Sequence, residues 1–484
     1  MATCLGNLNL EGPDHLVLDR ILSKIEGDSK ITGITHNGSG LAIWPFIRHQ
    51  ILFYFTFTKR NFSSVGKGHS ATKLEVVRTL IFTIWKNAFL LIAKKKPIWI
   101  INSGITNVKT GNKYFNRLAD YFYYVRPNDT IVLEETAYGK HSLPRAHDDV
   151  YSHLSIRILA RIFSSVIYKS EVVNIQSQLD SLFVALQERL SDEGYDAEFF
   201  ENVKNELRSK FRTILSEYAI YKFLFKHGKP KMLLVEDASY GSKSHLIKAA
   251  KDLHIPVAEY QHGQINQHHI AYNFGPSIDK SSYLNFLPDY FLTFGSLWGD
   301  MIQLPVKKVN IGNPHLSESV ENAKGIAKEK IILVLGSGTN AQEMIHHVLR
   351  LNARFRTKGY QVLFRPHPLE WATADAVYKR ILDEKIKIDT TSNLYNSLQR
   401  AEVVVSELST ALYEAKAFVN NVYVIRNHFS ESFGDESINI FPTLTESADL
   451  EFIGNDRTNN SSYQLWEQNW KKNYEEFIRS VINQ

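Results

Sequence analysis

Residues 331–338 read Ile331-Ile332-Leu333-Val334-Leu335-Gly336-Ser337-Gly338, an unbroken apolar run that ends in a glycine-rich turn. An apolar run without polar alternation is typical of a parallel strand that is covered on both faces. A helical stretch follows the turn, so backbone N–H groups at this point would attract a phosphate. The stretch therefore predicts a strand–turn–helix unit of a doubly wound α/β domain.

Similar apolar runs recur on both sides of this stretch and indicate a repeated pattern. They occupy residues 98–101, 130–133, 232–235, 257–260, 290–294, 362–364, 403–405 and 422–425. Helical stretches separate the runs, including the long ones at 150–169 and 172–226. Two successive strand–helix series predict an α/β fold of two facing, Rossmann-like parallel-sheet domains.

The domain limits follow from changes in the sequence pattern along the chain, from helical stretches to strands that alternate with helices. We expect a helical N-terminal segment over residues 1–96, with amphipathic patterns at 16–25, 44–57 and 74–93. An N-terminal Rossmann-like domain would cover 97–312, and a C-terminal one 313–455. Aromatic residues at helical spacing predict a C-terminal amphipathic helix within 456–484.

Composition excludes several classes of protein. The 484 residues are 44% hydrophobic and 22% charged, which is ordinary for a globular chain and excludes a disordered one. Cys4 is the single cysteine, so no intramolecular disulfide or cysteine-based zinc site is expected, and a cytoplasmic address fits. A net charge of +5 does not indicate a nucleic-acid partner. We expect no secretory signal and no spanning helix.

Polar side chains follow three strands of the first domain. Glu236-Asp237 and Glu134-Glu135 are adjacent carboxylates, and Gln261-His262-Gly263 closes a third strand. In open parallel sheets, ligands bind beyond the carboxyl ends of the strands. A histidine or one of two neighbouring carboxylates at such an edge suits a general base. Glu236, Asp237 and His262 are therefore candidate catalytic residues, and structural roles remain open for each.

The second domain carries three further candidates at its strand ends. Gly336-Ser337-Gly338 would lie under a phosphate, and Arg365-Pro366-His367-Pro368 holds a guanidinium and an imidazole on a stiff backbone. Ser409-Thr410 begins a helix, where hydroxyl and N–H groups converge. Glu414, one turn later, would reach a ribose or face solvent. A tight turn, a structural histidine and a simple helix cap are the corresponding structural interpretations.

Several motifs are missing from the sequence. Gly336 to Ala341 matches the dinucleotide pattern G-x-G-x-x-A, but the next predicted strand does not end in the acidic residue that the pattern requires. A P-loop and a D-x-D motif are both absent. The pairs His268-His269 and His346-His347 lack partners at metal-ligand spacing. We therefore expect no metal and no cofactor.

The chain resembles bacterial glycosyltransferases of the GT-B fold that build surface polysaccharides. The resemblance is carried by three segments: Gln261-His262-Gly263, Arg365-Pro366-His367-Pro368 and Ser409 to Ala415. More narrowly, they resemble CMP-sialic acid and CMP-Kdo transferases, and a related pattern occurs in teichoic acid polymerases. The resemblance implies that His367, Ser409 and Thr410 contact the nucleotide phosphate. It implies a base at Glu236 or Asp237 in the first kind of enzyme and at His262 in the second.

The resemblance implies an inverting, metal-independent glycosyltransferase that transfers a CMP-activated ulosonic acid to a glycan acceptor, with Glu135, Gln261 and Gly263 on the acceptor side. A CDP-polyol phosphate transferase and a UDP-sugar GT-B enzyme are the alternatives. A sugar-nucleotide 2-epimerase, an NADP oxidoreductase and a non-enzymatic scaffold also remain open. Because the acceptor is expected to be lipid-linked, the segment from Leu80 to Lys96 is a hypothetical docking site on the inner membrane face.

Overall fold

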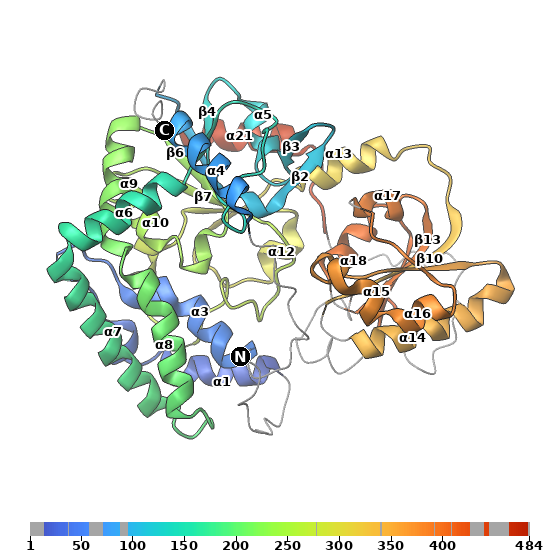
Figure 1. Ribbon diagram of the computed structural model, residues 1–484, viewed down its shortest axis with the longest axis horizontal. Coiled ribbons are helices and arrows are strands. Elements are labelled where there is room, and N and C mark those ends of the chain that lie inside the picture. Colours follow the sequence, from blue (N-terminus) through green and yellow to red (C-terminus); the bar gives the residue numbers. More distant parts are fainter. Residues whose placement is uncertain are drawn as a thin grey trace.

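The computed structural model describes residues 14–36, 38–57, 71–87, 95–276, 278–338, 341–391, 393–407, 409–425, 440–444 and 464–482. Cys4, Thr339 and Asn340, which the sequence interpretation used, lie outside these ranges. The chain forms two lobes, one around each of two large sheets, as Figure 1 shows. All neighbouring strands within each large sheet are parallel.

The first sheet has the strand order β5-β4-β1-β6-β7-β8-β9. These strands are β1 (Ile98–Ser103), β4 (Thr130–Glu135), β5 (Val150–Ser152), β6 (Met232–Val235), β7 (Val257–Tyr260), β8 (Tyr290–Thr293) and β9 (Lys307–Asn310). The order reverses between β1 and β6, as in doubly wound folds. A small antiparallel hairpin, β2 (Asn107–Thr110) with β3 (Lys113–Asn116), follows β1.

The second sheet repeats this arrangement with the order β12-β11-β10-β13-β14-β15. Its strands are β10 (Glu329–Leu335), β11 (Gln361–Arg365), β12 (Lys387–Ile388), β13 (Ala401–Ser406), β14 (Asn421–Ile425) and β15 (Thr443–Leu444). The order reverses between β10 and β13. The structure thus confirms the predicted fold of two doubly wound parallel sheets.

Helices cover both faces of each sheet, because successive strand residues point to opposite sides. In the first lobe, Trp99 and Ile101 pack against α6, α9 and α10, whereas Ile98 and Ile100 pack against α5 and α21. The helices of this lobe are α5 (Asp120–Val125), α6 (Leu154–Val166), α7 (Lys169–Arg189), α8 (Ala197–Phe211), α9 (Ile214–Gly228), α10 (Ser244–Lys251), α11 (Lys280–Tyr283) and α12 (Ser296–Asp300).

In the second lobe, Ile332 and Val334 pack against α14, and Ile331 and Leu333 belong to the cluster that includes α17 and α18. The helices here are α13 (Pro314–Asn322), α14 (Ala341–Phe355), α15 (Ala374–Val377), α16 (Lys379–Asp383), α17 (Leu394–Leu398) and α18 (Thr410–Ala415). The cluster around α18 continues into the first lobe, where the Trp298 ring lies 4.9 Å from the Tyr413 ring. The two lobes therefore share an aromatic contact.

The N-terminal helices α1 (Asp14–Ile25), α2 (Ser29–Thr32) and α3 (Ile43–Phe57) pack against α7 and α8 of the first lobe, and α4 (Lys73–Asn87) lies apart from them, against β5. A buried ion pair between Arg48 and Glu26 ties α3 to α1. Arg48 also donates to the Asn273 carbonyl at 2.6 Å, and Glu26 accepts from the Gly275 N–H at 2.5 Å. This pair therefore fixes the N-terminal helices to the segment after β7.

The C-terminal helix α21 (Trp470–Ile482) returns to the first lobe. Tyr474, Phe477, Ile478 and Val481 pack against the β1–β6–β7 side of the first sheet. Trp466 precedes the helix, and residues before Gln464 in the predicted segment lie outside the described ranges. The domain limits at 96, 312 and 455 stay a prediction.

The structure differs from the sequence interpretation in its short elements. Residues 150–169 were predicted to be entirely helical, but β5 occupies Val150–Ser152 before α6 begins. The edge strands β9, β12 and β15 and the hairpin of β2 and β3 were not predicted. Short edge strands carry little apolar periodicity, and only pairing with a neighbouring strand defines them. Within the described residues, no helix is long and apolar enough to cross a membrane.

We expect Arg48→Met to lower the free energy of unfolding by about 3–5 kcal/mol, because it leaves the Glu26 carboxylate buried without its cation. Urea denaturation followed by circular dichroism measures this loss. Arg20→Met is the matched control: Arg20 is 47% exposed, and its partner Glu193 keeps a second cation in Lys24. The control should cost less than about 1 kcal/mol. Equal losses for both variants would contradict this role of Arg48.

Candidate functional site

The two sheets place their polar strand ends where the lobes meet. The loop after β7 contacts the start of α18, because the Gln264 N–H donates to Thr410 Oγ1 at 3.0 Å. His262 is two residues from Gln264, so the backbone keeps the two within about 7 Å. The predicted base region of the first lobe and the predicted Ser-Thr segment of the second therefore lie at one interface.

A chain of polar rings occupies the first-lobe side of this interface. His262 Nδ1 lies 3.1 Å from Asp237 Oδ1, without the in-line geometry of a hydrogen bond. The Tyr240 hydroxyl lies 3.2 Å from His262 Nε2 and 3.1 Å from His269 Nε2. Burial lowers the pKa of His269 to about 3, so this ring is neutral at physiological pH. Tyr240 therefore links a neutral histidine to the Asp237–His262 pair.

The loop that carries Asp237 has an unusual backbone. Asp237 adopts the left-handed region with φ +54°, which is rare for residues other than glycine, asparagine and aspartate. Gly241 follows with φ +83°, and a Cβ atom there would lie 2.3 Å from the Pro45 carbonyl oxygen of α3. Strained backbone of this kind is often kept at functional sites. The loop is thus pressed against α3, and glycine is required at 241.

A cleft of about 320 Å³ opens beside Asp237 and Tyr240. Its other wall comes from α3 and includes His49, Phe53 and Tyr54. The His49 ring lies 4.3 Å from the Tyr240 ring, and burial lowers the pKa of His49 to about 4. No motif in residues 1–96 indicates a binding role for these helices, so the sequence did not predict this wall. A polar, aromatic cleft of this kind suits a sugar-like ligand.

Glu236, a predicted base, is turned away from the cleft. It is buried, and its carboxylate accepts from the Ser103 N–H at 2.7 Å and the Tyr260 hydroxyl at 3.3 Å. Burial, together with the neighbouring Asp237 charge, raises the pKa of Glu236 to about 7. Glu236 therefore fixes the end of β1 to β6, whereas Asp237 lines the cleft and lies beside His262.

Glu259 is a second buried carboxyl under the same loop, and the sequence interpretation did not single it out. It accepts from the Ser239 N–H at 3.0 Å and from the Tyr272 hydroxyl at 2.9 Å. Burial raises its pKa to about 8 despite these hydrogen bonds, and the Asp237 charge adds to the rise. Glu259 lies within β7, before the polar residues that follow the strand, so no local pattern marks it. Only the fold shows that its carboxyl group lies under the Asp237 loop.

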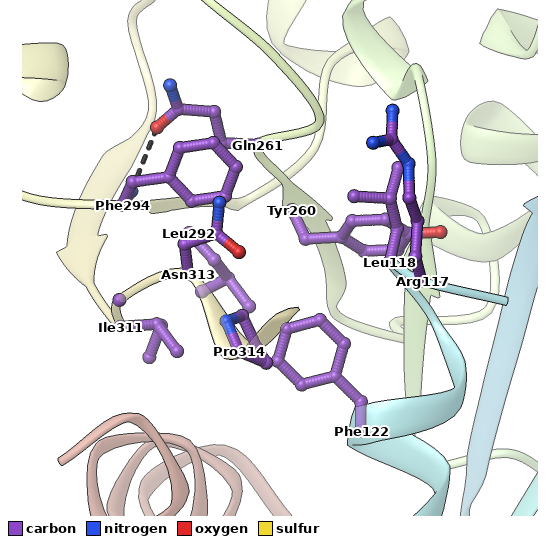
Figure 2. Close-up of a pocket in the computed structure, with 11 residues that line it drawn as sticks. Arg117, Leu118, Phe122, Tyr260, Gln261, Leu292, Phe294, Ile311, Asn313 and Pro314 are labelled. Carbon is purple, nitrogen blue, oxygen red and sulfur yellow. Dashed lines mark hydrogen bonds between the residues drawn. The ribbon is translucent and has the colours of Figure 1, made fainter. Parts of the chain in front are cut away.

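The predicted acceptor-side residues have separate positions. Glu135 lies near two cations, 3.2 Å from Arg157 and 4.0 Å from Lys243. The Gln261 side chain donates to the Gly263 carbonyl at 2.8 Å and accepts from the Phe294 N–H at 2.8 Å, the bond drawn in Figure 2. Gln261 therefore holds the His262–Gly263 turn in place. The small cavity in Figure 2 is a packing gap beneath it.

On the second-lobe side, the glycine turn lies against His367. Gly338 has φ +81°, and a Cβ atom there would lie 3.1 Å from the Cβ of His367. The Ser337 hydroxyl donates to the buried Glu407 carboxylate at 2.9 Å, and the Gly336 N–H donates to the Arg365 carbonyl at 2.8 Å. Burial lowers the pKa of His367, which favours a neutral ring. The predicted turn and the His-Pro segment thus form one surface.

The Arg365 guanidinium is predicted from the sequence to contact a ligand phosphate. In the structure the guanidinium is buried, pairs with Asp389 at 2.8 Å and donates to the Thr391 carbonyl at 2.7 Å. Arg365 therefore stabilises the neighbouring loop. Pro368 is exposed at the start of a short 3-10 helix, Pro368–Thr373.

Ser409 and Thr410 both accept hydrogen bonds from backbone groups. Ser409 caps α18 by accepting from the Ala411 N–H at 3.2 Å, and Thr410 accepts from Gln264 as described above. Since a hydroxyl group both accepts and donates, each side chain still carries a hydrogen that can bond to a phosphate oxygen. Glu414 is buried and accepts from the Tyr395 hydroxyl at 3.0 Å, so it does not face solvent.

Within the described residues, no group of three or more histidine, cysteine, aspartate or glutamate side chains is placed to hold a metal ion. On one lobe, the arrangement offers two neighbouring proton acceptors, Asp237 and His262. On the other lobe, it offers hydrogen-bond donors. Such a site can move a proton on one side and stabilise an anion on the other.

No family model matches this sequence, and no curated protein matches it. Among solved structures, UDP-GlcNAc 2-epimerase from Methanocaldococcus jannaschii is similar, with a TM-score of 0.46 and 11% identity over 80% of this chain and 99% of that chain. The trehalose-phosphate synthase from Burkholderia xenovorans has a TM-score of 0.37 and 11% identity over 79% and 99%. Likenesses of this degree carry no argument about the reaction.

The raised pKa of Glu259 predicts a specific pH dependence of stability. The folded chain holds the proton on Glu259 up to about pH 8, whereas the ordinary value is 4.5. Between these values the folded state binds more protons, so this contribution favours folding at low pH and is lost as the pH rises through about 8. We expect Glu259→Gln to lose less stability than the wild type between about pH 6 and about pH 9.

Urea denaturation at the two pH values measures the difference. The surface variant Glu188→Gln is the matched control and should keep the wild-type dependence. If Glu259→Gln and the wild type lose the same stability over this interval, Glu259 does not hold a proton in the folded state.

Proposed function

We propose that this protein is an inverting glycosyltransferase that uses a nucleotide-activated sugar, with the donor on the second lobe and the acceptor on the first. One observation carries the proposal: Asp237, which lies 3.1 Å from His262, lines a cleft on the first lobe, and the loop that holds His262 contacts Thr410 on the second. Transfer requires a base near an acceptor hydroxyl and an anion site near the leaving group. This interface supplies residues of both kinds.

In the proposed reaction, the acceptor lies in the cleft between α3 and the Asp237 loop. The acceptor oxygen attacks the anomeric carbon and gives its proton to the Asp237–His262 pair. The bond from the anomeric carbon to the phosphate oxygen breaks, and the electron pair leaves with the nucleotide. Tyr240 positions the His262 ring through its hydroxyl. Asp237 can accept the proton directly or hold the charged His262 ring.

The leaving phosphate would lie on the second lobe, between the Gly336–Gly338 turn, His367 and the Ser409–Thr410 segment. The hydroxyl hydrogens of Ser409 and Thr410 and one N–H of the neutral His367 ring can donate to its oxygens. The Arg365 guanidinium is paired with Asp389 and is not counted among these donors. We propose that the reaction needs neither metal nor cofactor.

The His-Pro and Ser-Thr segments favour a cytidine nucleotide, and the finer proposal is a CMP-activated ulosonic acid such as Kdo or a sialic acid, transferred to a glycan of a surface polysaccharide. His262 lies 3.1 Å from Asp237, which lines the cleft, and this position also supports the second candidate, a CDP-polyol phosphate transferase, whose expected base is this histidine. A UDP-sugar donor is the third. We place the protein in the cytoplasm, where nucleotide sugars are made.

Nucleotide binding is the first test. We expect CMP or CDP to raise the melting temperature of the wild type, since a ligand at 100 times its Kd adds about 2.7 kcal/mol of stability. The rise should be lost in His367→Ala and kept in His346→Ala, a control at an exposed histidine on α14. The measurement is a thermal-shift panel of CMP, CDP, UMP, UDP, GDP and NADPH.

A preference for CMP over CDP favours ulosonic acid donors, which a transfer assay with CMP-Kdo and CMP-sialic acids then separates from CDP-polyols. Stabilisation by UDP alone would overturn the cytidine proposal, and UDP-GlcNAc turnover without an acceptor would identify an epimerase. Stabilisation by NADPH, or by no nucleotide, would overturn the glycosyltransferase proposal itself.

The assignment of the base predicts a split between catalysis and binding. We expect Asp237→Asn and His262→Ala to lower kcat for transfer by about 10²–10⁴-fold, because each removes part of the proton acceptor. Asparagine tolerates the left-handed backbone at 237, so this variant should fold. Nucleotide affinity should not change, since the donor site lies on the other lobe. Steady-state kinetics with the donor that the panel selects measure the effect.

His227→Ala, at an exposed histidine near the end of α9, is the control and should keep wild-type kcat. Glu236→Gln distinguishes the role of Glu236 from that of Asp237, and this variant should keep most of the transfer activity. A large loss of kcat in Glu236→Gln with little change in Asp237→Asn would move the base to Glu236.

A further inference from the structure

Helix α4 is packed with its polar side toward the protein. Its buried residues are Thr79 and Thr83, and the Thr83 hydroxyl lies 2.9 Å from the Ser152 hydroxyl of β5. On the opposite side, Ile81 is 63% exposed and Ile84 is 72% exposed, and Trp85 is exposed beside them. Surface helices of globular proteins normally bury the apolar face. The apolar face of α4 therefore points to solvent.

Helix α6 also exposes large aliphatic residues. Its buried residues are Ile156, Ala160 and Ser164, and the Ser164 hydroxyl lies 2.7 Å from the Ser216 hydroxyl of α9. Leu159, Ile162 and Val166 lie on the outer side, where Val166 is 73% exposed. Two helices that leave several large aliphatic residues exposed on their outer sides indicate a surface for contact with something outside the chain.

The two helices are neighbours, so their outer residues form one surface. α4 contacts both α6 and β5, and the Asn87 side chain at the end of α4 lies 2.5 Å from the Ser155 hydroxyl at the start of α6. In Figure 1, α6 runs along the side of the first lobe that faces away from the second, and α4 lies nearer the middle of the first lobe. We call this surface the α4–α6 face. Its outer residues are Val77, Ile81, Ile84, Trp85, Leu159, Ile162 and Val166.

The charge around the α4–α6 face is positive. Residues 71–87 and 154–169 contain six lysines and arginines and a single carboxylate, Glu75. Glu75 is already paired with Lys140 at 2.7 Å. Arg78 and Arg161 are exposed on the two helices. A second copy of the same face would bring two positive surfaces together, which disfavours a symmetric dimer, whereas an anionic surface would be attracted.

We propose that the α4–α6 face lies on an anionic lipid bilayer, with the aliphatic residues in the acyl boundary and the cations at the headgroups. Apolar residues flanked by lysine and arginine are typical of interfacial helices, and tryptophan favours the membrane interface. The surface differs from the segment Leu80 to Lys96 that the sequence suggested. Lys96 is turned inward and pairs with Asp149 at 2.9 Å, and residues 88–94 lie outside the described ranges.

Vesicle flotation with the full chain tests the proposal. We expect the wild type to float with vesicles of phosphatidylcholine containing phosphatidylglycerol and to bind less well to phosphatidylcholine alone. Raised salt should weaken binding, because it screens the attraction between the cations and the lipid headgroups. Ile81→Glu with Ile84→Glu, and separately Ile162→Glu, should reduce the bound fraction at least tenfold.

Val184→Glu is the matched control, because Val184 is an exposed valine on α7, about four turns from the end of α6. It should bind vesicles like the wild type. All these sites are exposed, so thermal melting should show that the variants fold. Tryptophan fluorescence of the wild type should shift to the blue with anionic vesicles, and this shift should be lost in Trp85→Phe.

The proposal is overturned if the wild type does not float with anionic vesicles, or if the α4 and α6 variants float as well as the wild type. It is also overturned if analytical ultracentrifugation shows a dimer that Ile162→Glu dissociates, because the face would then bind a second copy. None of these measurements involves a nucleotide, so the result is independent of the proposed reaction.

Discussion

Every strand in both large sheets runs parallel to its neighbours, and this single constraint places the polar strand ends of each sheet along one edge. Because both faces of a parallel sheet are covered by helices, the edge at the carboxyl ends is the place where polar groups meet solvent or a ligand. Asp237 and His262 lie at this edge in the first lobe, and Gly338 and His367 lie at the corresponding edge in the second. The contact between Gln264 and Thr410 then brings the two edges together.

Buried carboxyl groups and histidine rings surround Asp237. Glu236 and Glu259 lie beneath the loop with raised pKa values, and the buried Lys243 donates to the Glu236 carbonyl at 2.6 Å. His49 and His269 flank the cleft as neutral rings. Burial favours the protonated form of Glu259 and the neutral forms of His49 and His269, which reduces the charge around Asp237. The half-buried Asp237–His262 pair lies beside the cleft and is the proposed proton acceptor.

The N-terminal helices take two different roles in the fold. α1 and α3 are fixed to the first lobe by the buried pair of Arg48 and Glu26, and α3 also closes the cleft opposite Asp237. α4 instead turns its threonines inward and its aliphatic side chains outward. In the proposed function, one part of this segment would shape the acceptor site and another would hold the protein at a lipid surface, where a lipid-linked acceptor is found.

The alternation of strands and helices is predictable from the sequence alone, because long apolar runs such as 98–101 and 331–335 have enough pattern to identify buried strands. It also marked the strand ends at Asp237, His262 and His367, since these residues directly follow such runs. The folded chain is needed to see that Asp237 alone of these three lines the cleft. The neighbours Glu236 and Asp237 are equivalent in sequence, but the left-handed backbone at 237 turns one outward while Glu236 bonds to β1. Local sequence patterns do not identify His49, Tyr240 and Asp389, because their partners lie far away along the chain. Packing alone brings such groups into contact.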